Sequence, residues 1–109
     1  MNDAVIVVTN LPDRESALRL AGELVEKRLA ACVNVLAECA SVYRWKGAVE
    51  SAREVPVLIK TRAARYAEVE AAIRKLHPYE LPEIVAVPVV HGFDDYLRWV
   101  ADETSSASG

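Results

Sequence analysis

The chain begins with a short, continuous apolar run at residues 4–9 (AVIVVT), which is rich in β-branched side chains and therefore predicts a central strand. Asn10 to Asp13 interrupts the run, and Asp13 is expected to cap the helix that follows. A helix of about four turns with one buried face is predicted by apolar residues at intervals of 3 and 4. The stripe consists of Leu18, Ala21, Val25 and Leu29, widened by Ala17, Leu20 and Leu24.

A second strand is expected at 31–36, and a long hairpin is expected at 41–61 around Gly47. Polar and apolar residues alternate over 41–46, which is typical of a strand with one wet face. The returning arm becomes strongly apolar at 55–59, where Pro56 indicates a sheet edge or a bulge. The outer part of this hairpin is expected to stand away from the sheet.

The spacing of Tyr66, Val69, Ile73 and Leu76 predicts a second helix, which should end near His77 because Pro78 disfavours helical geometry in the residue before it. Two prolines stiffen the loop at 79–83. Beyond it, we expect a strand at 84–90, where Pro88 marks an edge or a bulge. A short helix capped by Asp94 and carrying Tyr96, Trp99 and Val100 should follow, and then a disordered tail at 104–109.

The order β-α-β-β-α-β plus a C-terminal helix predicts an α+β, ferredoxin-like split βαβ fold in one domain, residues 1–103. In this plan, both helices cover the same face of a four-stranded antiparallel sheet. Yet the runs 5–8, 55–59 and 84–90 are apolar on both strand faces. Another copy of the chain is the simplest cover for the second face, so we predict a stable homo-oligomer.

Composition narrows the range of partners. With 109 residues, the chain has room for one domain. Its 13 basic and 16 acidic residues give a net charge of −3, which does not favour a nucleic-acid partner. No apolar run approaches the ~20 residues of a membrane span, and no basic region or cleavage site marks the N-terminus for export. Two cysteines are too few for a disulfide framework, so a cytoplasmic location is expected.

The sequence contains no familiar nucleotide-binding or catalytic motif, and we expect the protein not to be an enzyme. Cys32 and Cys39 are candidates for a soft metal, since thiolates favour Cu(I) and zinc. However, their separation of seven residues is not that of a ligand loop. Burial as a small hydrophobe is the alternative for both cysteines.

The densest polar cluster is His77-Pro78-Tyr79-Glu80, with Glu83 just beyond. An imidazole and carboxylates on a stiff loop are able to hold a divalent cation or orient a small ligand. In the alternative reading, His77 bonds the last carbonyls of the preceding helix and Tyr79 fills the core.

Tyr43, Trp45 and Lys60 are candidates for lining a cleft, in which Lys60 would meet an anion such as phosphate or carboxylate. In the alternative, the two aromatic residues anchor an interface, which is the interpretation we favour for them. Lys60 would then be a charged residue at a sheet edge.

At these residues, the chain resembles the CutA family of divalent-cation tolerance proteins over nearly its whole length. The matching segments occur in the family's order and at its separations. They are ACVNVL at 31–36, SVYRWKG at 41–47, LIKT at 58–61, HPYELPEI at 77–84, PV at 88–89 and YLRW at 96–99. Ala37 stands where the family commonly has a proline, so Cys39 lies in a variable stretch.

The resemblance implies a tight homotrimer whose long hairpins pair with neighbouring subunits, which would put Tyr43 and Trp45 at the trimer interface. The similarity to PII signalling proteins implies a ligand cleft between subunits that involves Lys60, Tyr79 and the rest of the 77–83 loop. Cys32, His77 and Glu80 match family positions considered for metal binding, and Glu83 lies on the same loop.

We therefore expect a non-enzymatic homotrimer that binds divalent metal, copper above zinc, in metal homeostasis. No obligatory cofactor, nucleic acid or membrane is expected, and a protein partner of unknown identity is left open. The alternatives are a PII-like module that binds a small anion or nucleotide between subunits, and a purely scaffolding trimer.

Overall fold

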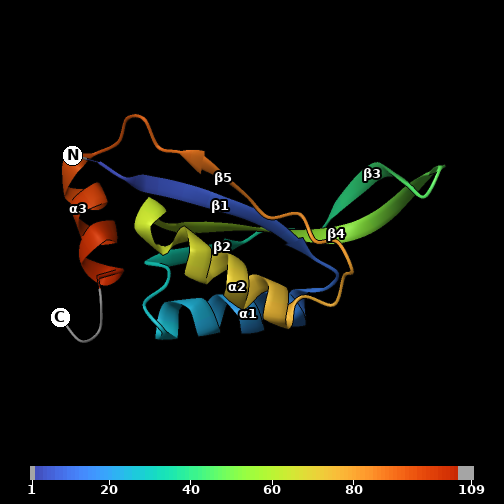
Figure 1. The fold of residues 1–109 in the computed structure, drawn as a ribbon, viewed down its shortest axis with the longest axis horizontal. Coiled ribbons are helices and arrows are strands. Elements are labelled where there is room, and N and C mark those ends of the chain that lie inside the picture. Colours follow the sequence, from blue (N-terminus) through green and yellow to red (C-terminus); the bar gives the residue numbers. More distant parts are fainter. Residues whose placement is uncertain (1, 106–109) are drawn as a thin grey trace.

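The computed structural model describes residues 2–105 as a mixed α+β fold (Figure 1). Its elements follow one another as β1 (Ala4–Leu11), α1 (Arg14–Glu26), β2 (Cys32–Val35), β3 (Cys39–Trp45), β4 (Ala48–Arg62), a short 3₁₀ turn (Ala63–Arg65), α2 (Tyr66–Leu76), β5 (Val85–Pro88) and α3 (Asp94–Glu103).

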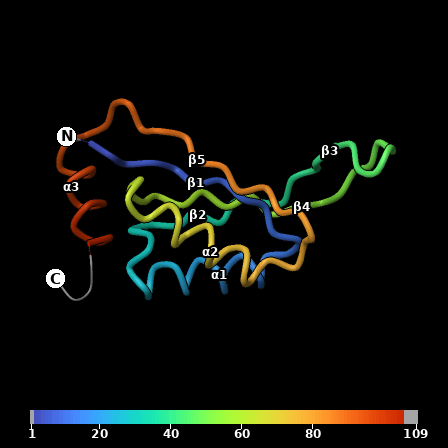
Figure 2. Tube along the Cα trace, viewed as in Figure 1, coloured from blue at the N-terminus to red at the C-terminus, as the bar shows by residue number. Residues whose placement is uncertain are grey.

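All strand pairs are antiparallel, in the order β2-β4-β1-β5. The expected long hairpin is confirmed: β3 pairs only with the outer half of β4, from Cys39 opposite Glu54 to Trp45 opposite Ala48. This β3–β4 arm projects beyond the rest of the molecule, as the trace in Figure 2 shows. Among the described residues, the outer edges of both strands of this arm are therefore unpaired.

Helices α1 and α2 pack on one face of the sheet and form the core with it. Alternate residues of β1 and β4 point into this core, including Val7, Leu11, Val57 and Ile59, each no more than 1% exposed. The helices contribute Ala17, Leu20, Leu24, Val69 and Ile73. This is the arrangement expected for two helices covering one sheet face.

The buried stripe predicted for α1 is centred on the wrong residues. Leu18 and Val25 are 51% and 44% exposed, whereas Ala17, Leu20 and Leu24 are completely buried or nearly so. Both sets have helical spacing, so periodicity alone did not separate them. The sheet selects the narrower set because its side chains lie in the middle of the face that α1 presents to β1 and β4.

Two of the proline predictions hold. Helix α2 ends at Leu76, and His77 is already extended before Pro78. Pro88 lies in β5, an edge strand, although β5 is shorter than the predicted 84–90. Pro56 is not at an edge: it lies in central strand β4, where the pairing partner changes from β2 to β3. The strand beside β4 is interrupted at this point. The backbone N–H that proline lacks would therefore have had no ladder bond to make.

The face of the sheet opposite α1 and α2 is largely uncovered. In antiparallel strands, directly opposed residues share a face, so the register identifies its members. We call these residues the open face: Ile6, Val8, Cys32, Asn34, Leu58, Lys60, Val85 and Val87. Val85 and Val87 are 48% and 47% exposed. Such an apolar sheet surface is unusual for a lone subunit.

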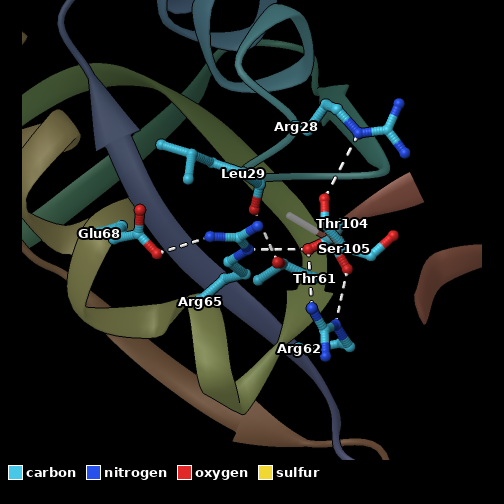
Figure 3. A network of polar contacts seen from close by, with 8 residues as sticks. All are labelled: Arg28, Leu29, Thr61, Arg62, Arg65, Glu68, Thr104 and Ser105. Atoms are coloured by element: carbon cyan, nitrogen blue, oxygen red, sulfur yellow. Dashed lines mark hydrogen bonds and ion pairs between the residues drawn. The ribbon is translucent and has the colours of Figure 1, made fainter. Parts of the chain in front are cut away.

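Helix α3 lies at the end of the sheet where β1 begins, and three arginines hold its C-terminus there (Figure 3). Arg62 donates to the carbonyl oxygen of Thr104 at 2.8 Å and to its Oγ1 at 2.9 Å, and Arg65 donates to the same carbonyl at 2.7 Å. Arg28 donates to the carbonyl of Asp102 at 3.0 Å. Because cations stabilise the C-terminal end of a helix, this arginine clamp fixes α3.

The clamp corrects the prediction that the disordered tail begins at residue 104. Thr104 is completely buried, because its backbone and hydroxyl both take part in the clamp. Residues 106–109 lie outside the described residues. Asp94 is also not the helix cap: Phe93 takes that position without a side-chain bond, and Asp94 occupies the first turn. In the part of the chain from 2 to 105, no helix is long and apolar enough to cross a membrane.

Candidate functional site

The loop between α2 and β5 passes the end of β1 near the base of the β3–β4 arm (Figure 1). Its first residue, His77, is only 8% exposed. Its Nε2 donates to the carbonyl of Asn10 at 2.6 Å, and its Nδ1 accepts from the backbone N–H of Tyr79 at 3.2 Å. These two bonds fix a neutral ring with its proton on Nε2. In this conformation, His77 has no free lone pair for a metal.

Asn10 joins His77 to a carboxylate. Its side-chain Nδ2 donates to Oε1 of Glu83 at 2.9 Å, while its carbonyl accepts from His77. Glu80 is exposed on the same loop. A carboxylate has about four acceptor positions, so one bond from Asn10 leaves Glu83 with capacity for a cation.

Tyr79 stacks at a tilt on His77, with the ring centroids 4.6 Å apart. Burial, followed by the negative charge of Glu54 and its hydrogen bond, raises the pKa of Tyr79 to about 12. Glu54 is itself only 9% exposed, at the point where the arm leaves the sheet. The phenol of Tyr79 therefore links the loop to the base of the arm.

Asn10 and Glu54 were not among the predicted site residues. Asn10 stood in a segment read only as a strand breaker, and Glu54 preceded an apolar run, as many solvated residues do. For Glu54, the one available signal was its place in the predicted strand that continues from 55 back to 48, where some burial is expected. That signal identifies no partner, because the register with β1 and β3 is set only by the fold.

The four predicted metal ligands do not gather in one chain. Cys32 is half-buried on β2 and lies opposite Lys60, which in turn lies opposite Ile6. His77 is bound to Asn10, four residues further along β1, or ~13 Å at the rise of a strand. Within residues 2–105, no group of three or more His, Cys, Asp or Glu side chains is placed to hold a metal ion.

Within one chain, the residues predicted to line the ligand cleft are also far apart along the sheet. Lys60 lies on the open face and donates to the side-chain oxygen of Asn34, whereas Tyr79 faces Glu54 at the other end of the sheet. A cleft that uses both residues would need two subunits. The predicted interface residues Tyr43 and Trp45 both lie on the projecting arm, and Tyr43 is 40% exposed. Their contact with a neighbour stays a prediction.

Comparisons with known proteins give matches that cover nearly the whole chain. Residues 5–103 match the family model described as CutA1 divalent ion tolerance protein. The divalent-cation tolerance protein CutA of Thermus thermophilus is 40% identical over 91% of this chain and 96% of its own length. Protein CutA of Mus musculus is 42% identical over 89% of this chain, which spans 55% of the mouse protein. The crystal structure of CutA from Xylella fastidiosa superimposes with a TM-score of 0.91 at 40% identity, covering 94% of this chain and 99% of that one.

Proposed function

Because the chain belongs to the CutA1 family of divalent ion tolerance proteins, we propose that it acts as a homotrimer that binds divalent metal ions, copper above others. The observation that carries the metal proposal is the loop 77–83, which presents two carboxylates beside a buried, hydrogen-bonded imidazole. In this proposal the protein supports tolerance by binding and catalyses no reaction.

The homotrimer is supported by two surfaces that a lone subunit leaves exposed. One is the open face, on which Val85 and Val87 are exposed and Ile6, Val8 and Leu58 are half-buried. The other is the projecting arm, where Val42 and Val49 are 73% and 66% exposed. We propose that the sheets, connected as in a ferredoxin-like split βαβ fold, pack face to face about a common axis while the arms pair with neighbours. Tyr43 and Trp45 would then be interface residues.

For the metal, we propose Glu83 and Glu80 as the carboxylate ligands from one chain. His77 positions the loop, and it becomes a ligand only where Nδ1 gives up its bond to Tyr79 N–H. Cys32 lies too far along the sheet to join from the same chain, so a neighbouring subunit or water completes the coordination. Copper(II) is the preferred ion because it binds a given oxygen and nitrogen site most tightly among the first-row divalent metals.

Replacement of Glu83 by glutamine is expected to weaken copper(II) binding at least tenfold, about 1.4 kcal/mol, because the amide keeps the shape but loses the charge. Isothermal titration calorimetry on the two proteins measures this. Glu50→Gln, on the exposed outer part of β4, is the matched control and should bind as the unmodified chain does. Equal affinity in the Glu83 and Glu50 variants would remove Glu83 from the site.

The location that we propose is the cytoplasm. Fractionation of cells followed by immunodetection of the untagged protein tests it: recovery in the soluble cytoplasmic fraction supports it, and recovery in a periplasmic or organellar fraction contradicts it.

A further inference from the structure

A groove of about 530 Å³ lies where the C-terminal ends of α1 and α3 meet the start of β2. Its apolar wall includes Val25 on α1 and Trp99 on α3, which are 44% and 41% exposed. Neither residue belongs to the open face. Since a cavity of ~150 Å³ holds benzene, this groove has room for an indole ring together with a lysine side chain.

The charges around the groove favour a cation. Glu26 and Glu103 border it, and within residues 2–105 Glu26 forms no ion pair. Arg28 also lines the groove, but its guanidinium donates to the carbonyls of Asp102 and Ser105 and lies 3.9 Å from Glu103. Neither α1 nor α3 has a basic residue in its last turn, so each helix end adds partial negative charge.

The tip of the β3–β4 arm has the complementary character. Its turn consists of Lys46 and Gly47, whose φ values of 49° and 85° are both positive, as in the tight type I′ turn of a hairpin. The ammonium of Lys46 lies 5.5 Å from the ring centroid of Trp45, and the side chain is exposed. Arg44, also exposed, adds a second positive charge. The tip therefore presents an indole ring and two cations on a well-defined turn.

The tip and the groove lie at opposite ends of the chain, whose longest dimension is 46 Å (Figure 1). They therefore cannot meet within one subunit. The seven residues of β3 carry the tip ~23 Å beyond the sheet at the rise of a strand. In a ring of three copies, each subunit contacts its neighbour through two different surfaces. An arm at one end and a groove of opposite charge at the other end meet this requirement.

We propose that, in the homotrimer, the arm tip of each subunit docks in the groove between α1 and α3 of its neighbour. Lys46 pairs there with Glu26, and Trp45 packs against Val25 and Trp99. This inference rests on the proposed homotrimer, for which it names the surface that receives the arm. It is independent of metal binding.

The first test uses the unmodified full-length protein in its native assembly. A water-soluble carbodiimide joins a lysine to a carboxylate in contact with it and leaves no spacer, and mass spectrometry of the digested covalent dimer identifies the pair. We expect an amide bond between Lys46 and Glu26 or Glu103, which joins two chains because the tip and the groove of one chain are too far apart.

An intact trimer in which Lys46 is joined to other carboxylates, or to none, would overturn the docking and leave the homotrimer standing. A monomer mass in light scattering before the reaction would instead refute the homotrimer and the docking together. This test needs no variant, so it does not depend on whether a substituted chain folds.

An exchange of charges tests the pair itself. Lys46→Glu and Glu26→Lys should each speed the exchange of subunits between isotope-labelled and unlabelled trimers at least tenfold, as followed by native mass spectrometry. The double variant restores opposite charges, so its exchange rate should return to within about threefold of that of the unmodified protein.

Lys75→Glu is the matched control, since Lys75 is exposed at the end of α2, and it should leave the exchange rate unchanged. Unchanged rates in the two single variants, or a double variant that exchanges as fast as they do, would show that Lys46 and Glu26 do not pair, and the proposal would fail.

Discussion

Replacement of Leu58 by glutamate is expected to leave the chain folded but to convert the proposed homotrimer into a monomer. Leu58 lies in the middle of the open face, opposite Val8 on β1 and Asn34 on β2. In a lone subunit the new carboxylate would be solvated. In a trimer packed through this face, each subunit would have to remove an added charge from water, at several kcal/mol per ion. Size-exclusion chromatography with light scattering measures the mass, and far-UV circular dichroism reports the fold.

The matched control is Leu18→Glu. Leu18 is also a surface leucine, 51% exposed, but it lies on α1 at the other side of the molecule. The trimer should tolerate it. If Leu18→Glu dissociates the trimer and Leu58→Glu does not, the subunits associate through the helical layer, and the role assigned to the open face is wrong.

Replacement of His77 by alanine is expected to lower the free energy of unfolding by about 3 kcal/mol. The substitution leaves the carbonyl of Asn10 without its donor and the N–H of Tyr79 without its acceptor, and it opens space under the Tyr79 ring. Urea denaturation in the absence of metal measures the loss.

His91→Ala provides the comparison, since His91 is exposed between β5 and α3 and should change stability little. The two roles considered for His77 then separate cleanly. An unchanged unfolding free energy in His77→Ala together with lost copper binding would make His77 a ligand and contradict the positioning role.

The sequence predicted the elements well where one local cause dominates. Pro78 ends α2 through its effect on His77, and Gly47 lies in the turn between β3 and β4 with a φ of 85°. It was less informative where two faces of one element looked alike, as with Leu18 and Leu20 on α1. Which of those faces is buried depends on packing against the sheet, which local periodicity does not contain.

The candidate site was predictable as a segment but not as a set of partners. The sequence pointed to the 77–83 loop because a histidine, a tyrosine and two glutamates crowd between prolines. That Asn10 and Glu54 meet this loop follows from the register of β1 with β4, a long-range property. The same register separates Cys32 and Lys60 from His77, residues that a family resemblance had grouped together.

Native mass spectrometry of the untagged protein, with and without one equivalent of copper(II) per chain, tests the account most directly. We predict the mass of a trimer in both samples and, in the second, whole-number copper that survives buffer exchange into metal-free solution. A monomer mass would contradict the assembly through the open face, and a trimer that loses all its copper would contradict the metal site.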